Sequence, residues 1–101
     1  MGKMFTKGIP AVYIMTNKSR SVLYTGVTSD LSKRIYEHKN DVMKGFTSRY
    51  NCKSLAFYKV LPDMMTAIEW EKKIKAGSRR KKLEMIEQLN PGWVDLYAEL
   101  V

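Results

Sequence analysis

Five residues of the chain could do chemistry if they point inward: Tyr13, Tyr24, Arg34, His38 and Glu71. A carboxylate among apolar neighbours costs several kcal/mol unless it is paired or bound to a cation. A histidine on an apolar helix face is either a hydrogen-bonded core residue or a proton-transferring group. Inward polar groups therefore need either separate partners or a shared purpose.

Glu71 is singled out by a helical wheel drawn at about 100° per residue over the segment that follows Asp63. The apolar arc of that segment contains Met64, Ala67, Ile68, Trp70 and Ile74. Glu71 falls in the middle of this arc, whereas Glu69 lies outside it. One interpretation is an ion pair with Lys75, one turn further on, and the other is a bound cation.

A second helix pattern places His38 and Arg34 inward. Ser29 and Asp30 are typical of a helix start, and Leu31, Ile35 and Val42 then recur at helical spacing until Gly45. His38 lies within this arc, and Arg34 lies beside it one turn earlier. We expect both side chains to face the sheet or its edge.

The two tyrosines belong to a predicted hairpin. The β-branched and aromatic runs 11–15 and 22–27 are separated by the polar stretch 16–21. If those six residues form the loop, Met15 pairs with Val22 and Tyr13 lies opposite Tyr24. Two phenols then lie side by side on one face of the sheet.

The remaining pattern completes a small α+β domain. Residues 55–60 predict a third strand, and two further helices are expected from Asp63 to about Ala76 and from Ser78 to about Leu89. The order is β-β-α-β-α-α. We expect a three-stranded, mainly antiparallel sheet flanked by three helices in a single domain spanning 1–101, with a loose start up to about Gly8.

Charge points to a polyanion partner. The chain has 101 residues, a formal net charge of +8 and a pI of about 9.7. A basic cluster at the junction of the last two predicted helices suits backbone phosphates; its members are Lys72, Lys73, Lys75, Arg79, Arg80, Lys81 and Lys82, and Arg49 joins them from a polar loop. Alternatively, the cluster is a solvated surface.

Other classes of protein are disfavoured by the sequence. The longest apolar run, 9–15, is too short to cross a membrane and contains a proline. A single cysteine, Cys52, cannot form an internal disulfide or a zinc cluster, so we expect a cytoplasmic protein.

In order and spacing, these motifs resemble the GIY-YIG nuclease family, closest to its small stand-alone bacterial branch of endonucleases. Residues 11–13 stand where the family has Gly-Ile-Tyr, and residues 24–26 where it has Tyr-Ile-Gly. Arg34 and His38 look like the family's Arg followed by His or Tyr. Residues 67–71 are similar to the segment whose glutamate holds the metal, which selects Glu71. The resemblance extends from about Ala11 to Leu96, including residues 45–51 and the closing 90–93.

Two positions depart from the family pattern. Ala11 replaces the first glycine, and Val27 stands where the similar N-terminal nuclease domain of the bacterial excision-repair endonuclease has a lysine. Asn90 is matched to a late asparagine of the family.

The resemblance implies a DNA endonuclease that hydrolyses phosphodiester bonds with Mg²⁺ or Mn²⁺ held by Glu71, in DNA repair or recombination. Arg34 would bind the scissile phosphate, Tyr24 would orient or deprotonate water beside Tyr13, and His38 is the alternative base. A protein partner could supply the targeting to particular DNA.

Two other functions remain open at this point. One is a DNA- or RNA-binding module without activity, in which Tyr36, Tyr50 and Tyr58 stack on bases. The other is a docking surface for an acidic protein. DNA or RNA binding without cleavage under any divalent metal would favour the first. Tight binding to an acidic protein, with no binding to DNA at any salt concentration, would favour the second.

Overall fold

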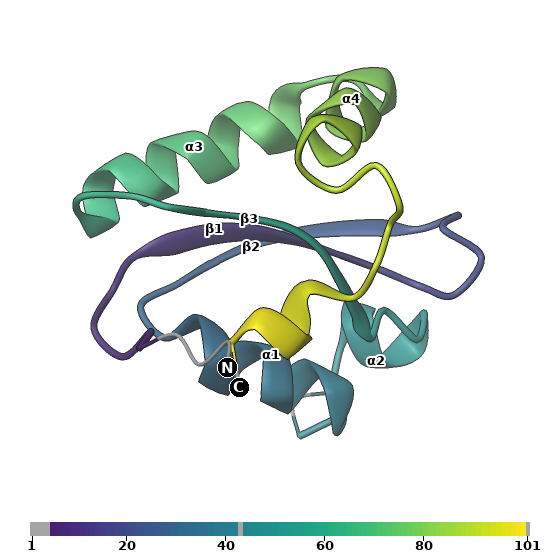
Figure 1. The fold of residues 1–101 in the computed structure, drawn as a ribbon, viewed down its shortest axis with the longest axis horizontal. Helices are drawn as coiled ribbons and strands as arrows, with labels where there is room; N and C mark the ends of the chain where they lie inside the picture. Colours follow the sequence, from purple (N-terminus) through teal and green to yellow (C-terminus); the bar gives the residue numbers. More distant parts are fainter. Residues whose placement is uncertain (1–4, 43, 101) are drawn as a thin grey trace.

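A computed structural model shows one three-stranded sheet with helices on both faces (Figure 1). It describes residues 5–42 and 44–100. The elements, in chain order, are β1 (Ala11–Thr16), β2 (Leu23–Thr28), α1 (Leu31–Lys39), α2 (Phe46–Arg49), β3 (Ser54–Val60), α3 (Met64–Ala76), α4 (Arg79–Leu89) and the 3₁₀ helix η1 (Leu96–Glu99). The expected α+β class and antiparallel sheet are confirmed. The count of three helices was short, because α2 and η1 are single turns that carry too little periodicity to be read from sequence.

The sheet order is β2-β1-β3, with β1 antiparallel to both neighbours. Helices α3 and α4 cover one face, whereas α1, α2 and η1 lie on the other (Figure 1). Each face has its own core. Tyr13, Met15 and Ile35 belong to the core on the α1 side, and Val12 and Ile14 to the core under α3 and α4.

The predicted hairpin register was wrong by two residues. Met15 pairs with Tyr24, and Tyr13 pairs with Gly26. The chain reverses later than expected because Asn17 organises the loop: its Oδ1 accepts hydrogen bonds from the backbone N–H groups of Ser21 (2.9 Å) and Val22 (3.1 Å). A shift of two residues keeps every side chain on its predicted face, so both phenols still share one face, in a diagonal arrangement.

Side-chain caps begin the three long helices where the sequence predicts. The carboxylates of Asp30 and Asp63 and the hydroxyl of Ser78 each accept a hydrogen bond from the backbone N–H three residues on. Helix α1, however, ends at Lys39, and Val42 is 60% exposed rather than part of the apolar arc.

The apolar arc of α3 is narrower than expected. Ala67 and Ile74 are buried, whereas Met64 and Ile68 are exposed. The N-terminal segment is tied down by Thr6, within the stretch expected to be loose. Its buried hydroxyl donates to Asp30 at 2.8 Å, and residues 1–4 lie outside the described part.

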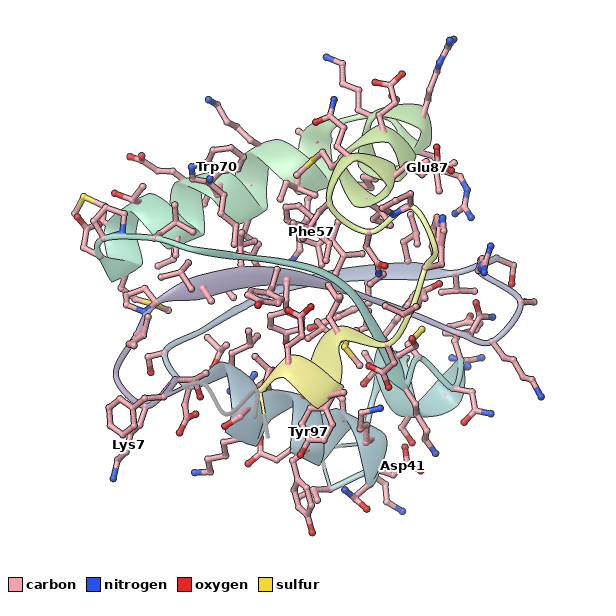
Figure 2. All side chains as sticks on the ribbon, viewed as in Figure 1. Lys7, Asp41, Phe57, Trp70, Glu87 and Tyr97 are labelled. Carbon is pink, nitrogen blue, oxygen red and sulfur yellow. The ribbon has the colours of Figure 1, made fainter. Side chains whose placement is uncertain are left out.

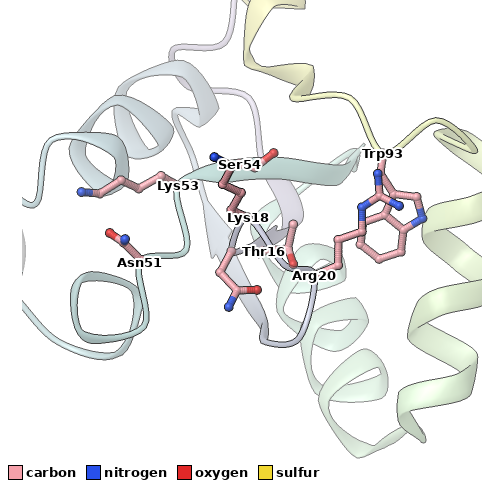
Figure 3. A pocket seen from close by; sticks show the side chains of 8 residues that line it. Thr16, Lys18, Arg20, Asn51, Lys53, Ser54 and Trp93 are labelled. Atoms are coloured by element: carbon pink, nitrogen blue, oxygen red, sulfur yellow. The ribbon is translucent and has the colours of Figure 1, made fainter.

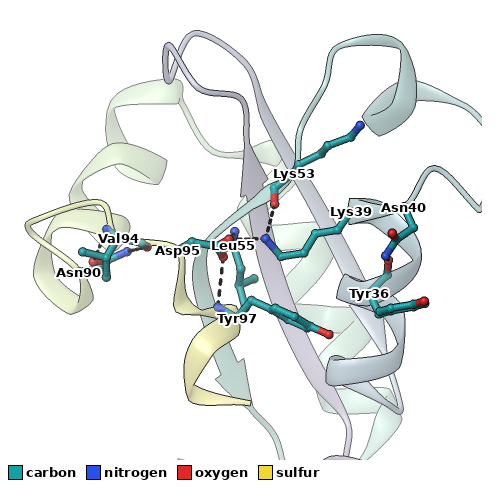
Figure 4. Close-up of polar contacts among 9 residues, drawn as sticks. All are labelled: Tyr36, Lys39, Asn40, Lys53, Leu55, Asn90, Val94, Asp95 and Tyr97. Carbon is teal, nitrogen blue, oxygen red and sulfur yellow. Dashed lines mark hydrogen bonds and ion pairs between the residues drawn. The ribbon is translucent and has the colours of Figure 1, made fainter. Parts of the chain in front are cut away.

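Polar contacts fix the C-terminal segment across the sheet (Figure 4). Asp95 Oδ1 accepts from the N–H groups of Leu55 (3.0 Å) and Tyr97 (3.1 Å), and its Oδ2 pairs with the ammonium of Lys39. This segment completes the α1-side layer: Figure 2 shows Tyr97 on that side of the sheet, while Phe57 and Trp70 lie on the other. None of the helices in the described part of the chain has the length and apolar character to span a membrane.

Candidate active site

Three rings from three elements meet on the α1 side of the sheet. The ring centroids of Tyr13 and Tyr24 are 6.4 Å apart, and that of His38 lies 5.6 Å from Tyr13 and 5.7 Å from Tyr24. Tyr13 and His38 are buried, while Tyr24 is half-buried. The sequence-based expectation that these three residues face inward together is what the structure shows.

A hydrogen-bond chain fixes the buried part of this cluster. The phenol of Tyr13 lies 2.8 Å from Nε2 of His38, and Nδ1 of His38 lies 2.9 Å from Oγ1 of Thr47. Burial lowers the pKa of His38, with a further lowering from the positive charge of Arg34. A neutral imidazole donates through one nitrogen and accepts through the other, so both of its positions are used.

Burial raises the pKa of Tyr13 above its ordinary value, and the neighbouring Tyr24 raises it further. Tyr13 is therefore a neutral phenol at physiological pH. It can donate a hydrogen bond to His38, but it is a poor acceptor of a proton from water.

Gly26 makes room for the Tyr13 ring. It is the cross-strand partner of Tyr13 on the edge strand β2, and a Cβ placed there would lie 2.5 Å from Cζ of Tyr13. That contact is too close for any carbon atom. The glycine of the Tyr-Thr-Gly run thus has a packing reason: it lets the tyrosine of the neighbouring strand lie across it.

Arg34 and Glu71 complete the set from two different layers. The positive charge of Arg34 lowers the pKa of Tyr13 and the negative charge of Glu71 raises it, both less strongly than burial does. Both charges therefore act on the same phenol, Arg34 from α1 and Glu71 from α3, which packs over β2 and β1. The other four residues selected from sequence therefore all act on Tyr13.

Each of the two charged residues also has an ion-pair partner on its own helix. Arg34 Nε lies 3.3 Å from Glu37 Oε1, and Glu71 Oε2 lies 3.2 Å from Lys75 Nζ. The lysine pair is the alternative that the sequence left open for Glu71. Its Lys75 side chain is 55% exposed while that of Glu71 is 18% exposed, so the lysine is the partner more easily displaced.

The residues present fit a magnesium-type ion with one protein ligand. Within residues 5–42 and 44–100, no group of three or more His, Cys, Asp or Glu side chains comes together to form a metal cage. Mg²⁺ does not require one, because it commonly keeps several waters and takes one or two carboxylates plus substrate phosphate. The half-buried Glu71 carboxylate is the group that would hold the ion.

An aromatic ladder, which the sequence did not reveal, leads from this cluster to the surface. Phe46 stacks on Tyr24 with centroids 5.8 Å apart and 30° between ring planes, and Tyr50 lies 4.7 Å from Phe46. Phe46 is 45% exposed and Tyr50 is 42% exposed. The guanidinium of Arg49 lies 5.7 Å above the Tyr50 ring. The sequence indicates Tyr50 as a stacking residue, and the resemblance includes residues 45–51, but nothing in the sequence connects Phe46 to Tyr24.

The basic cluster lies on the outside of the other layer, on α3 and α4. Its members are largely exposed, and two of them make further contacts: Arg80 pairs with Glu84 at 3.6 Å, and Arg79 Nη2 donates to the backbone carbonyl of Arg20 at 3.0 Å. The expected nucleic-acid-binding residues therefore divide, with Arg49 on the α1 side and the others over α3 and α4.

Asn90 lies apart from the site. It is buried at the end of α4, where its amide donates to the carbonyls of Ala56 (3.1 Å) and Val94 (2.8 Å) and accepts from Val94 N–H (3.1 Å). Figure 4 shows this asparagine beside Val94. These contacts give it a structural role in the turn after α4.

Comparison with known proteins agrees with this geometry. The GIY-YIG catalytic domain model matches residues 9–84. A UPF0213 protein of Staphylococcus saprophyticus is 34% identical over 77 residues, covering 76% of this chain and 93% of that protein. One from Halalkalibacterium halodurans is 33% identical over 75 residues, covering 74% and 79%.

A solved structure shares the fold. The solution NMR structure of a UPF0213 protein from Bacillus halodurans matches with a TM-score of 0.52 at 32% identity, covering 83% of this chain and 87% of that one. The family model spans most of the chain, including β1, β2, α1 and α3, from which the five converging residues come. The chain therefore belongs to the GIY-YIG family, whose catalytic domain has a nuclease-type fold.

Proposed function

We propose that this protein is a divalent-metal-dependent endonuclease that hydrolyses phosphodiester bonds of DNA. One observation carries the proposal: Tyr24, Arg34, His38 and Glu71, from β2, α1 and α3, all act on the phenol of Tyr13. Chains that only bind nucleic acid need exposed cations and stacking surfaces. They do not need a half-buried carboxylate and an arginine whose charges both act on one phenol that is bonded to an imidazole.

Arg34 is the residue that would bind the scissile phosphate. Its guanidinium carries a fork of donors that matches two phosphate oxygens, and it already lies near the Tyr13 phenol. Binding a phosphate would compete with Glu37, whose carboxylate is paired with the guanidinium. Half-buried ion pairs of this kind are weak enough to exchange partners.

Glu71 would hold Mg²⁺ or Mn²⁺, which acts as a Lewis acid on the phosphate and its leaving oxygen when bound. The protein's part is to place this carboxylate. Lys75, one turn further on, pairs with it and would give way to a bound metal ion.

Tyr24 is the residue that would orient the attacking water. Both ring nitrogens of His38 are already hydrogen-bonded, and the raised pKa of Tyr13 makes that phenol a poor base. Tyr24 is half-buried, and its ring stacks on the exposed Phe46. This is the side from which DNA would approach. In this mechanism His38 and Thr47 hold Tyr13, and Tyr13 supports Tyr24 by ring contact.

A chain of 101 residues leaves little surface beyond the site for reading bases, so the substrate is a DNA structure recognised by its shape, in repair or recombination. A partner protein could direct it to particular DNA. The basic residues of α3 and α4 would contact backbone phosphates, which makes binding fall steeply with salt.

The test is cleavage of a panel of labelled linear, flapped, branched and single-stranded DNA, each with Mg²⁺, Mn²⁺ or a chelator. We expect cleavage in either metal and none with the chelator. Glu71→Gln should abolish cleavage and leave salt-sensitive binding intact. Glu69→Gln, an exposed carboxylate on the same helix, is the matched control and should retain activity.

Cleavage by Glu71→Gln at the wild-type rate would overturn the metal assignment. Binding with no turnover in any metal would instead support the second function, a non-catalytic DNA- or RNA-binding module. A specific observation favours that alternative: Glu71 and Arg34 both have ion-pair partners on their own helices, as purely structural residues would.

A further inference from the structure

A cavity of about 420 Å³ lies at the hairpin end of the sheet (Figure 3). It is walled by the β1–β2 loop, the segment before β3 and the turn after α4, which contribute Lys18, Arg20, Asn51, Lys53 and Trp93. The volume is within the range of small-ligand sites and suits one nucleotide. The loop leads directly into β2, and Thr16 at its rim pairs with Leu23, the residue before Tyr24.

The lining is cationic. Three lysine and arginine side chains contribute to it, and none of its described lining residues is acidic. Lys53 is partly occupied, since its ammonium lies 2.8 Å from Asp41 Oδ2 and points away from Trp93 in Figure 3. Lys18 and Arg20 are therefore the cations available to an anion in the cavity.

The exposed Arg20 side chain lies against Trp93. Its guanidinium lies 5.1 Å from the centroid of the Trp93 ring, and Figure 3 shows the side chain extended along the indole. The backbone carbonyl of Arg20 accepts a hydrogen bond from Arg79, which connects the cavity to the basic cluster. A guanidinium stacked in this way presents its donors at its edge and its free face to a second planar group.

Backbone strain gathers around the same cavity. Four residues other than glycine have positive φ in the described part of the chain, and three of them line it: Arg20 (62°), Asn51 (60°) and Trp93 (53°). A bulky residue such as tryptophan rarely has a positive φ. Here Trp93 has it, although the residue before it, Gly92, is of the type that adopts positive φ without strain. Strained residues cluster where geometry serves binding.

We propose that this cavity binds one unpaired nucleotide of a DNA strand, its phosphate on Arg20 and Lys18 and its base stacked against the Arg20–Trp93 pair. The two recognition modes differ in what they read: cations take any phosphate, whereas stacking needs a base that is free of its duplex. The cavity therefore selects DNA with a single-stranded segment. This deepens the proposed function and rests on it for the link to cleavage, but the binding itself does not.

The test measures binding in a chelator, where no cleavage takes place. Labelled oligothymidylate and a duplex of equal length are titrated by fluorescence anisotropy against the wild type and Arg20→Asn. Asparagine tolerates positive φ, so this variant keeps the loop conformation and removes only the stacked cation. We expect affinity for the single strand to fall about tenfold and affinity for the duplex to fall no more than about twofold.

Lys59→Asn is the matched control. Lys59 also lies over a tryptophan, 5.2 Å from the Trp70 centroid, but outside this cavity. It removes the same unit of charge, so it should change single-strand affinity no more than about twofold. Equal losses in the two variants would overturn the proposal, because only net charge would then matter.

A second measurement does not depend on Arg20. In a Trp70→Phe protein the remaining tryptophan is Trp93, and bound oligothymidylate should quench its emission. Binding without any change in that emission would overturn the subsite. If the pocket binds single strands and nothing is ever cleaved, the proposed nuclease function fails and the subsite stands. If DNA is cleaved while Arg20→Asn binds single strands as the wild type does, the reverse holds.

Discussion

The two faces of the sheet have different contents. Under α3 and α4 the buried cluster is mostly aliphatic and aromatic, among its members Val12, Ile14 and Ile86, with Thr25 and Asn90 as buried polar residues. On the α1 side an imidazole, a phenol and a hydroxyl are buried and joined by hydrogen bonds through Tyr13, His38 and Thr47. β1 supplies both layers, because its residues alternate between them.

Because the two layers differ in composition, substitutions in them should affect different properties, stability in one and activity in the other. An apolar layer is stabilised by the apolar surface that it removes from water, and any polar group buried in it must be hydrogen-bonded. A buried polar layer is stabilised only if every donor and acceptor is satisfied, so its geometry is demanding. We therefore expect changes in the hydrogen-bonded and charged residues around Tyr13 to alter activity more than stability, and changes in the buried apolar residues under α3 and α4 to do the opposite.

The largest effect should follow Arg34→Ala. We expect the cleavage rate to fall about a thousandfold, because a guanidinium that binds a phosphate in the transition state contributes on that scale. The free energy of unfolding should change by less than about 1 kcal/mol, since the side chain is half-exposed. Single-turnover cleavage and urea unfolding measure the two quantities.

Lys33→Ala is the control for this variant, because Lys33 is an exposed cation next to Arg34. An equal loss of cleavage in both variants would show that general charge, and not the placed guanidinium, is what DNA cleavage needs.

Ile86→Ala should produce the opposite pattern. Ile86 is fully buried under the sheet, and truncating it removes apolar contacts and leaves a cavity, which costs about 3 kcal/mol. The folded fraction should cleave DNA as the wild type does. Leu89→Ala, on the same helix but 51% exposed, should cost no more than about 0.5 kcal/mol. A loss of cleavage by fully folded Ile86→Ala protein would contradict the expectation that this layer contributes stability and not activity.

Local signals in the sequence predicted most of the elements. The cap residues Asp30, Asp63 and Ser78 each act within one helical turn, so they can be recognised without knowing the fold. The inward positions of His38 and Glu71 came from helical periodicity in the same way. The electrostatic convergence of Arg34 and Glu71 on Tyr13 was consistent with this pattern.

Long-range features could not be predicted in this way. The hairpin register depends on side-chain hydrogen bonds of Asn17, and the end of α1 on a chain reversal in which Asp41 has positive φ. The bond from His38 to Thr47 joins two elements across an irregular segment. Asn90 was placed in the site by resemblance, but its amide is occupied by backbone groups of β3 and of its own turn.

A smaller effect is expected from Gly26→Ala, which tests the contact between β2 and the polar layer. The added methyl must displace the Tyr13 ring, which is buried and bonded to His38, so we expect a loss of about 2 kcal/mol in the free energy of unfolding. Cleavage should fall as well, because Tyr13 would lose its place beside Tyr24.

Gly77→Ala serves as the comparison for Gly26→Ala. The φ of Gly77 is −76°, and a Cβ there would come no closer than 3.4 Å to the carbonyl oxygen of Ile74. We expect a change within about 0.5 kcal/mol. If the two alanine variants were equally stable, the Tyr13 ring would not be confined by Gly26.

The smallest effect is a pH dependence that only the polar layer can supply. His38 is the one histidine of the chain, and its pKa in the folded protein lies below the ordinary value of 6.5, chiefly through burial. As the pH falls below 6.5, the unfolded chain takes up a proton that folded His38 resists, so the free energy of unfolding decreases. The lowered pKa values of Asp41 and Asp63 lie below 3.8, so their contributions are lost only in more acidic solution.

Urea unfolding from pH 7 to about pH 5 would measure this dependence, with His38→Gln as the reference. The variant should be less stable at pH 7, because the bonds to Tyr13 and Thr47 are disturbed, but its stability should be nearly flat across the interval. A wild-type profile that is flat as well would mean that the imidazole is protonated as easily in the fold as in water. The hydrogen-bonded chain through Tyr13 would then have to hold an imidazolium, with both ring nitrogens donating, and the phenol of Tyr13 would have to accept rather than donate.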